Sequence, residues 1–276
     1  MGRTGQIAIL VNHLGNPFEA SLVSKVEAEV RERGYTLLLH TYRSDLEQEL
    51  AAMLANRIDG LILLGQTLQD TTVVMLQERS IPIVSLLRPA WDHNGIEHVD
   101  LDWLQVMRKT IEYLQSRGHH RIGFMANGNP AHYHTHRLSA FIQAMKLCKA
   151  EFQHDYVISG GGTYLKAYDA MERFLRSRDL AFTALVCAND LMAISALAAC
   201  RNNGVRVPGQ LAIIGCEDIL MSSETNPPLT TIRYTRDTLA QGAVRLLFAK
   251  IDGGEAGIPK ADIPQVEGYL LIRSSG

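Results

Sequence analysis

The amino-acid sequence predicts an α/β protein with two doubly wound parallel-sheet lobes and multiple crossovers between them. Short apolar runs alternate with amphipathic segments along the chain, as in parallel strands joined by helices. Most apolar runs are continuous, which indicates strands covered on both faces. The alternation runs from residue 6 to 117 and restarts at Arg121, so each stretch builds its own sheet.

The elements follow from this pattern in chain order. The expected strands cover 6–11, 35–40, 60–64, 81–87, 96–100, 121–126, 155–159, 183–188 and 211–215. The expected helices cover 17–33, 45–56, 70–79, 102–117, 137–149, 164–178 and 189–203. An extended segment at 229–234, a helix at 236–251 and a strand at 267–272 close the chain. These trailing elements predict that the chain crosses between the lobes more than once.

Local signals support the helix assignments. In the first expected helix, an apolar stripe recurs at four-residue steps, formed by Phe18, Leu22, Val26 and Val30. Gly34 follows at the place of a C-cap glycine. Other helices are expected to begin at N-capping side chains, namely Asp45, Asp70, Asp102 and Asn189.

The lobe boundaries follow from the break in the alternation. The segment 116–120 is the expected first crossing. The N-terminal lobe is then expected to cover 5–118 with about 232–258, and the C-terminal lobe 119–231 with about 259–276.

Composition and charge exclude several classes of protein. The chain has 276 residues, 46% apolar and 20% charged, as in an ordinary globular protein. Its formal net charge is −2, so these residues alone are not expected to bind DNA tightly. The first apolar run, 7–11, is too short for a signal peptide, and no run approaches the length of a membrane helix. We therefore expect no membrane association and a cytoplasmic location.

Cysteine usage agrees with the cytoplasm. Cys148, Cys187, Cys200 and Cys216 form no CxxC pair. Cys187 and Cys216 lie in apolar runs, where a thiol behaves as a small hydrophobic side chain. We expect reduced, buried cysteines.

Polar loops follow the expected strands. In open parallel sheets, ligands bind beyond the carboxyl ends of the strands. The loops at these ends include 12–18, 100–102, 127–137, 189–190 and 216–218, which carry Asn, His, Arg, Asp and Glu side chains. If two lobes face each other, these loops converge on one cleft suited to a polar small molecule.

Six segments carry a family resemblance, in the order IAILVNHLGNPF, RIDGLILLG, RGHHRIGFMANG, ALVCANDLMAISAL, VPGQLAIIGCEDI and PPLTTIRY. Taken together, they resemble the effector-binding core of the LacI/GalR family of bacterial transcription regulators, from residue 5 to about 273. In that family a helix-turn-helix headpiece precedes the core and binds DNA as a dimer. Here only residues 3–5 could represent the end of the linker, so the headpiece is expected to be absent from this sequence.

The resemblance implies the periplasmic-binding-protein-like fold of type I, and it also implies a function. The chain is expected to form a homodimer and to bind a small effector, a sugar or sugar derivative, in the cleft between its lobes. Effector binding would bias an open–closed equilibrium and change the affinity of the headpieces for operator DNA. No cofactor and no metal are expected.

The resemblance also implies the first site residues. Phe18 is expected to pack on a sugar or base ring, although it also fits the buried stripe of its helix. Arg137 would offer a rigid fork to hydroxyl pairs or to a carboxylate; the alternatives are a surface arginine and an ion pair between lobes. Asn189 would both donate to and accept from the ligand, and it also suits an N-cap.

Further positions depart from the family pattern or serve two roles. Glu217 stands where the family usually has an aspartate, and Cys216 replaces the usual aromatic before it. The Glu217 carboxylate would accept hydrogen bonds from ligand hydroxyls. Asp102 fits ligand contact and helix capping equally. His13, Tyr133 and Asn12 are weaker ligand candidates, and Asp190 is expected to be structural.

Two other patterns suggest different chemistry. His132, His134 and His136 alternate before a helix, but no clear third ligand accompanies them, so solvated loop histidines are expected rather than a metal site. The run 160–162 is all glycine and precedes a helix, where it could cradle an anion. No Lys-Ser/Thr pair follows it.

Catalytic motifs are missing. The sequence has no GxGxxG after the first strand, no GxxxxGK[ST] and no GxSxG. We therefore expect no enzymatic activity and no catalytic residues. The alternative function is a sugar-binding receptor of a transport system, which would require export and is usually monomeric.

Overall fold

The computed structural model describes residues 3–66, 68–87, 96–128, 136–177, 180–253 and 265–276, and these form two compact units. Unit 1 comprises Met1–Leu101 and Thr235–Val266, and unit 2 comprises Asp102–Tyr234 and Glu267–Gly276. The chain therefore passes repeatedly from one unit to the other, as the trailing elements predict.

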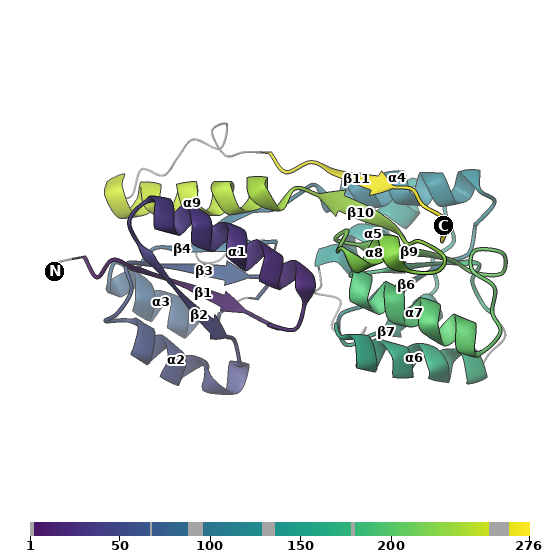
Figure 1. The fold of residues 1–276 in the computed structure, drawn as a ribbon, viewed down its shortest axis with the longest axis horizontal. Coiled ribbons are helices and arrows are strands. Elements are labelled where there is room, and N and C mark those ends of the chain that lie inside the picture. Colours follow the sequence, from purple (N-terminus) through teal and green to yellow (C-terminus); the bar gives the residue numbers. More distant parts are fainter. Residues whose placement is uncertain (1–2, 67, 88–95, 129–135, 178–179, 254–264) are drawn as a thin grey trace. The chain divides into compact units, whose positions relative to one another are not determined.

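Unit 1 is built on a parallel sheet with the strand order β2-β1-β3-β4-β5. Its elements are β1 (Gln6–Val11), α1 (Pro17–Glu32), β2 (Thr36–Thr41), η1 (Ser44–Leu46), α2 (Glu47–Leu54), β3 (Gly60–Leu64), α3 (Asp70–Glu78), β4 (Ile83–Leu86), β5 (Glu97–Val99) and α9 (Arg236–Gly253). Helices α1 and α9 cover one face of the sheet, and α2 and α3 cover the other (Figure 1). At Gly60 an added Cβ would lie 3.0 Å from the Leu247 side chain, which shows how closely α9 packs on β3.

The core of unit 1 follows the predicted periodicity. The stripe of α1 is completely buried, and β1 is buried from Ile7 to Val11. After α1, Arg33 is the C-cap and Gly34 has φ +78°, a conformation that glycine adopts without steric cost. The apolar stripe is therefore confirmed, and Gly34 ends the first helix from the position directly after the C-cap.

Unit 2 is built on a second sheet with the strand order β11-β10-β9-β8-β6-β7. Its elements are α4 (Trp103–Ser116), β6 (Ile122–Ala126), α5 (His136–Leu147), η2 (His154–Tyr156), β7 (Val157–Ser159), α6 (Tyr164–Ser177), β8 (Ala184–Cys187), α7 (Asp190–Asn202), β9 (Ala212–Cys216), α8 (Met221–Glu224), β10 (Thr230–Tyr234) and β11 (Gly268–Leu271). Strand β11 runs antiparallel to β10, and the other pairings of this sheet are parallel. Helix α4 packs with α5, and α6 packs with α7.

The boundaries of the units differ from the expected ones. The first crossing follows Leu101 rather than falling at 116–120, so α4 belongs to unit 2. Its buried side chains, such as Ile111 and Leu114, face unit 2, where α4 contacts α5 and β11. Tyr113 also donates from its hydroxyl to the Gly276 carbonyl, at 2.9 Å. The later crossings fall at 234/235 and 266/267, close to but not at the expected positions.

The cysteines lie almost as expected. Cys187, Cys200 and Cys216 are free and buried, whereas Cys148 is half-buried. Burial raises the pKa of Cys200 to about 12, so its thiol stays protonated at neutral pH. Within the described ranges, none of the helices has the length and hydrophobicity that a membrane span needs.

Candidate functional site

The carboxyl ends of the central strands of unit 2 meet at one edge of the sheet. Strands β6, β8, β9 and β10 run parallel to one another, so the residues that follow or end them lie side by side. These residues are Asn127, Ala188, Asn189, Glu217 and Tyr234. The edge therefore collects amide, carboxylate and phenol groups from segments far apart in the sequence.

Arg137, in the first turn of α5, is at the centre of this edge. Its Nη1 donates to the Ala188 carbonyl and to Glu217 Oε1, the latter at 3.3 Å, and its Nη2 donates to the Tyr234 hydroxyl at 3.0 Å. The side chains of Arg137 and Glu217 are 13% and 5% exposed. The guanidinium thus joins the ends of β8, β9 and β10.

An aromatic pair holds the guanidinium from one face. The guanidinium carbon of Arg137 lies 4.4 Å from the centre of the Trp103 ring, a cation–π contact. Trp103 also meets Tyr234 edge to face, with ring centres 5.6 Å apart. Both rings are 1% exposed. The fork of Arg137 is therefore fixed in orientation before any ligand arrives.

The electrostatics of Arg137 reflect these neighbours. Burial disfavours its charged form, but Tyr234, Cys216 and Glu217 outweigh that effect, and the pKa of the guanidinium is raised above its ordinary value. Arg137 consequently keeps its positive charge at every physiological pH.

Asn189 connects the start of α7 to neighbouring loops. Its Oδ1 accepts from the Met192 backbone N–H at 2.8 Å, the hydrogen bond of an N-cap. Its Nδ2 donates to the Gly162 carbonyl at 3.1 Å and lies 3.4 Å from Asn127 Oδ1. The predicted cap is confirmed, and the same side chain ties the glycine loop after β7 to the sheet edge.

Glu217 occupies an unusual backbone conformation. Its φ is +123°, and its backbone N–H donates to the Ile232 carbonyl at 2.8 Å. A non-glycine residue in this region is strained, and such strain persists where the surrounding structure holds it. The following Asp218 forms ion pairs with Arg273 at 2.7 Å and with Arg233 at 3.5 Å.

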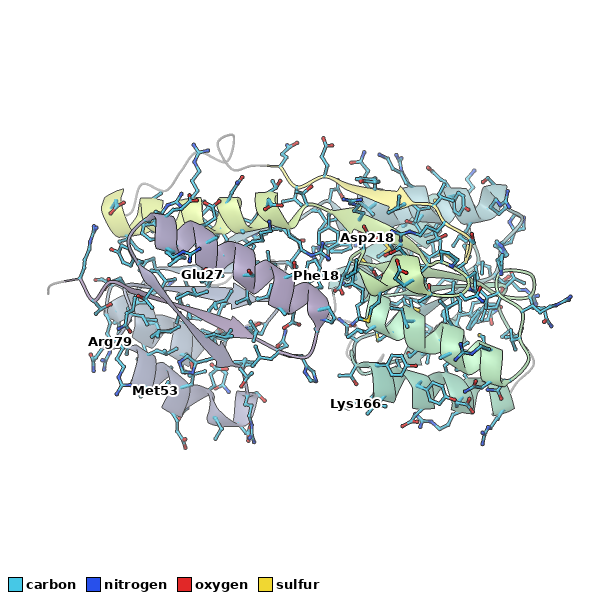
Figure 2. The ribbon with its side chains drawn as sticks, viewed as in Figure 1. Phe18, Glu27, Met53, Arg79, Lys166 and Asp218 are labelled. Carbon is cyan, nitrogen blue, oxygen red and sulfur yellow. The ribbon has the colours of Figure 1, made fainter. Side chains whose placement is uncertain are left out.

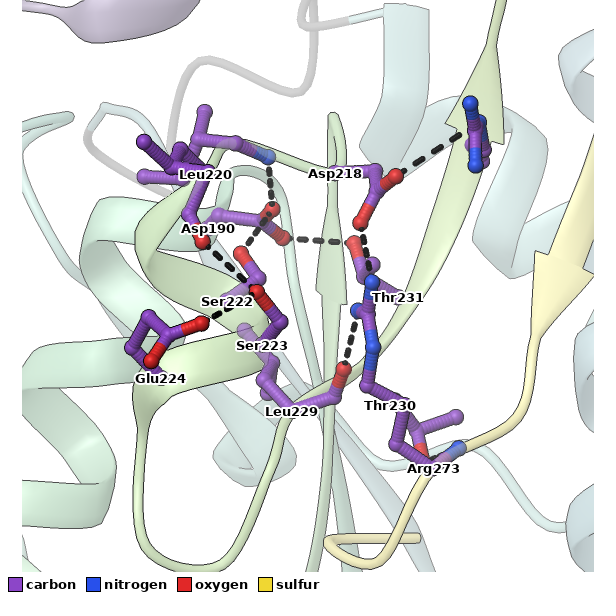
Figure 3. Close-up of polar contacts among 12 residues, drawn as sticks. Asp190, Asp218, Leu220, Ser222, Ser223, Glu224, Leu229, Thr230, Thr231 and Arg273 are labelled. Atoms are coloured by element: carbon purple, nitrogen blue, oxygen red, sulfur yellow. Dashed lines mark hydrogen bonds and ion pairs between the residues drawn. The ribbon is translucent and has the colours of Figure 1, made fainter.

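A buried carboxylate supports the loop that carries Glu217 (Figure 3). Asp190 Oδ2 accepts from the Ser222 hydroxyl at 2.6 Å and from the Ile219 N–H at 2.9 Å, and its Oδ1 accepts from the Thr231 hydroxyl at 2.6 Å. Desolvation raises the pKa of Asp190 despite these hydrogen bonds. Asp190 thus holds the β9–α8 loop and β10 to the start of α7, the structural role expected of it.

Comparisons with known proteins decide the family. The periplasmic binding protein-like domain family matches residues 111–275. The HTH-type transcriptional regulator CelR of Thermobifida fusca is 30% identical, over 99% of this chain and 82% of CelR. The chain belongs to the LacI family of transcriptional regulators.

Solved structures agree with this assignment. A complex of the transcriptional regulator CelR with cellobiose superposes with a TM-score of 0.86 at 29% identity, covering 99% of this chain and 85% of that one. A regulatory protein of the LacI family from Chloroflexus aggregans superposes with a TM-score of 0.78 at 28% identity, covering 99% of this chain and 98% of that one. The predicted fold and family are confirmed, and the relatives of this LacI-family core are transcriptional regulators rather than enzymes.

The predicted site residues of the LacI-family core fall into separate groups. Arg137, Asn189 and Glu217 lie together at the sheet edge of unit 2. Asp102, also in unit 2, is exposed and caps α4 by accepting from the Gln105 N–H at 3.0 Å. Tyr133 lies outside the described residues. For all of them, ligand contact stays a prediction.

Phe18 and His13 belong to unit 1. Phe18 lies at the start of α1 (Figure 2), is 1% exposed, and has the Arg236 guanidinium carbon 4.8 Å from its ring centre. His13 is exposed, and its backbone N–H donates to Glu19 Oε2 at 3.0 Å. Asn12 donates from Nδ2 to the Leu64 carbonyl at 3.2 Å.

The aromatic side of the Arg137 centre is absent from the residues predicted from the sequence. Trp103 opens α4, and Tyr234 is the last residue of β10. Each residue stands where a strand is followed by a helix, and such a junction can be recognised in the sequence. Of the three alternating histidines, only His136 lies within the described residues. Across the described ranges, no group of three or more His, Cys, Asp or Glu side chains could hold a metal ion.

Proposed function

We propose that the effector of this LacI-family core is a sugar or sugar derivative that binds at the Arg137 centre of unit 2. The fixed fork of Arg137 carries the proposal. Its hydrogen bonds within the described residues leave Nε–H and one N–H of Nη2 for a ligand. A planar, pre-oriented fork suits neighbouring hydroxyls or a carboxylate. The relative CelR, which is known in complex with cellobiose, supports the sugar class.

Regulation would follow from differential binding. An effector that binds one conformation of the regulator more tightly shifts the population toward it. A coupling of this kind changes the affinity of the full-length homodimer for operator DNA by about 5- to 150-fold. Such a regulator acts in the cytoplasm, where the DNA is. A transport receptor is the less supported alternative, because the relatives are regulators.

A thermal-shift screen tests the ligand class. Cellobiose, other sugars, sugar acids, sugar phosphates, nucleosides and bases are each titrated against the protein. A true effector raises the melting temperature progressively with its concentration. Isothermal titration calorimetry then gives its affinity. If nucleosides or bases bind and no sugar does, the proposed class is wrong.

A charge-balanced variant tests the site. Removing Arg137 alone would break its buried ion pair with Glu217, and loss of one member of such a pair costs about 3–5 kcal/mol. The double variant Arg137→Gln/Glu217→Gln removes both charges together, and the Glu217→Gln change is isosteric. We expect it to fold and to bind the effector about 10- to 100-fold more weakly, because the charged donor is lost. Arg176→Gln, an arginine of unit 2 that is 75% exposed, is the matched control and should bind normally. Unchanged affinity in the double variant would refute the site.

A further inference from the structure

The β9–α8 loop of unit 2 contains two consecutive non-glycine residues at positive φ. Glu217 has φ +123° and Asp218 has φ +49°. Residues with a Cβ rarely adopt this region, and such backbone strain persists only where the surrounding structure holds it. The Glu217 carboxylate pairs with Arg137, so the contacts that hold this stretch of backbone also fix the acidic side of the Arg137 centre.

Successive residues of this loop are held by different parts of unit 2. The Glu217 N–H donates to a carbonyl of β10, and the Ile219 N–H donates to Asp190. Between these two residues, the Asp218 carboxylate accepts a hydrogen bond from Arg273 Nη2 at 2.7 Å (Figure 3). Backbone hydrogen bonds thus fix the two flanking residues, and an ion pair fixes the residue between them.

Arg273 connects the loop to the start of β10. Its Nη1 donates to the Leu229 carbonyl at 2.7 Å, while its Nη2 binds Asp218. The side chains of Arg273 and Asp218 are 20% and 13% exposed, so water and salt screen their attraction only in part. Arg233 also pairs with Asp218, but at 3.5 Å and with 54% of its side chain exposed. Arg273 is therefore the stronger partner of Asp218.

The backbone of the segment that carries Arg273 is itself fixed. The Arg273 N–H donates to Thr230 Oγ1 at 3.0 Å. Two residues later, the completely buried Ser275 accepts from the Thr230 N–H at 2.8 Å, and its hydroxyl donates to the Ile213 carbonyl at 2.6 Å. The segment after β11 is thus hydrogen-bonded to both β9 and β10. Arg273 therefore extends toward Asp218 from a backbone that two strands hold.

We infer that Arg273 is a positioning residue that acts on effector binding through Asp218 and Glu217. By holding Asp218, it keeps the preceding Glu217 in the strained conformation in which the Glu217 carboxylate meets the Arg137 guanidinium. This role requires no contact between Arg273 and the ligand. The inference rests on the proposed function, because it concerns the binding of an effector at the Arg137 centre.

Arg273→Gln tests the inference by calorimetry, with cellobiose as the first probe and the other sugars of the screen after it. We expect affinity to fall about tenfold, because Glu217 can then relax away from Arg137. Asp218→Asn should give a similar loss, since asparagine tolerates positive φ and only the charge is removed. Arg176→Gln removes another arginine of unit 2 that pairs with a carboxylate, and it should bind as the wild type does.

The Glu217→Gln background separates positioning from a general loss of stability. If Arg273 acts through Glu217, Arg273→Gln should reduce affinity much less in this background than in the wild type. A residue that only stabilises unit 2 would lower the melting temperature and cost the same affinity in both backgrounds, and that result would overturn the inference. Unchanged affinity of Arg273→Gln in the wild-type background would overturn it as well.

Trp103 gives a readout that needs no ligand. The sequence has two tryptophans, and Trp91→Phe leaves only Trp103, whose ring lies against the Arg137 guanidinium. In that background, Arg273→Gln should change the fluorescence emission of Trp103 in the same direction as Glu217→Gln does. Emission that Arg273→Gln leaves unchanged would contradict the positioning role. If the wild type binds no sugar, the proposed function fails, and this measurement still decides whether Arg273 positions Glu217.

Discussion

Asp190 shows how one residue can shape the edge of a sheet. Its carboxylate holds a loop, a strand and the start of a helix in unit 2. Gly215 makes room for it, because an added Cβ there would collide with Asp190 Oδ1. The sequence indicated a structural role for Asp190 but not these partners. They come from β9, α8 and β10, and no periodicity in the sequence specifies such pairings.

The raised pKa of Asp190 predicts a pH dependence of stability. The folded state binds the proton more tightly than the unfolded state, whose pKa is close to the ordinary value of 3.8. Stability from this group is therefore fully present below that value and is lost as the pH rises through the folded pKa. Asp190→Asn does not titrate at this position. The free energy of unfolding of the wild type minus that of Asp190→Asn should thus increase as the pH falls from 7 to 4, by about 1.4 kcal/mol per unit of pKa shift.

Urea unfolding at a series of pH values measures this difference. Subtracting the variant cancels the other titrating groups, which are common to both proteins. A difference that grows as the pH rises would show that hydrogen bonding, not desolvation, dominates at Asp190.

Among the elements, the strands and long helices were predictable, whereas several of their ends were not. Asp102 and Asn189 cap α4 and α7 as expected. Asp45 and Asp70 do not: Asp45 lies inside η1, and Asp70 is the first residue of α3, after the N-cap Gln69. An acidic residue in the first turn is favourable through the helix dipole even without capping, so the sequence signal is the same. Helix α8 was missed because its four residues are too few for a periodic pattern.

Asn189 links two elements, and two variants separate its contributions. Asn189→Ala removes both the cap of α7 and the bond to the Gly162 carbonyl, and it should lower the free energy of unfolding by about 1–2 kcal/mol. Asn189→Asp keeps a capping oxygen but loses the donor to Gly162, so a smaller loss is expected.

Chemical denaturation of both variants, each compared with the wild type, measures these losses. Equal losses in Asn189→Ala and Asn189→Asp would show that the tether to the glycine loop, rather than the cap, carries the stability.

For the whole molecule, the strand–helix alternation revealed two sheets but misplaced the crossing between them. Helix α4 is amphipathic, and its pattern specifies that one face is buried without specifying in which unit. The residues around Arg137 show the same limit, because a sequence pattern does not specify which distant side chains come into contact. Arg137 was identifiable from a motif, whereas Trp103 reaches it through a tertiary contact between the starts of α4 and α5. Contacts between distant segments are where sequence reasoning failed.

The assembly of the molecule provides the last prediction. A LacI-family regulator reads paired half-sites on DNA, so this chain is expected to form a two-fold symmetric homodimer. Sedimentation equilibrium should give twice the mass of one chain at micromolar concentration. The melting temperature should rise with protein concentration, because only the folded state associates. A monomer at all concentrations that still binds a sugar would contradict the regulator mechanism and favour a transport receptor.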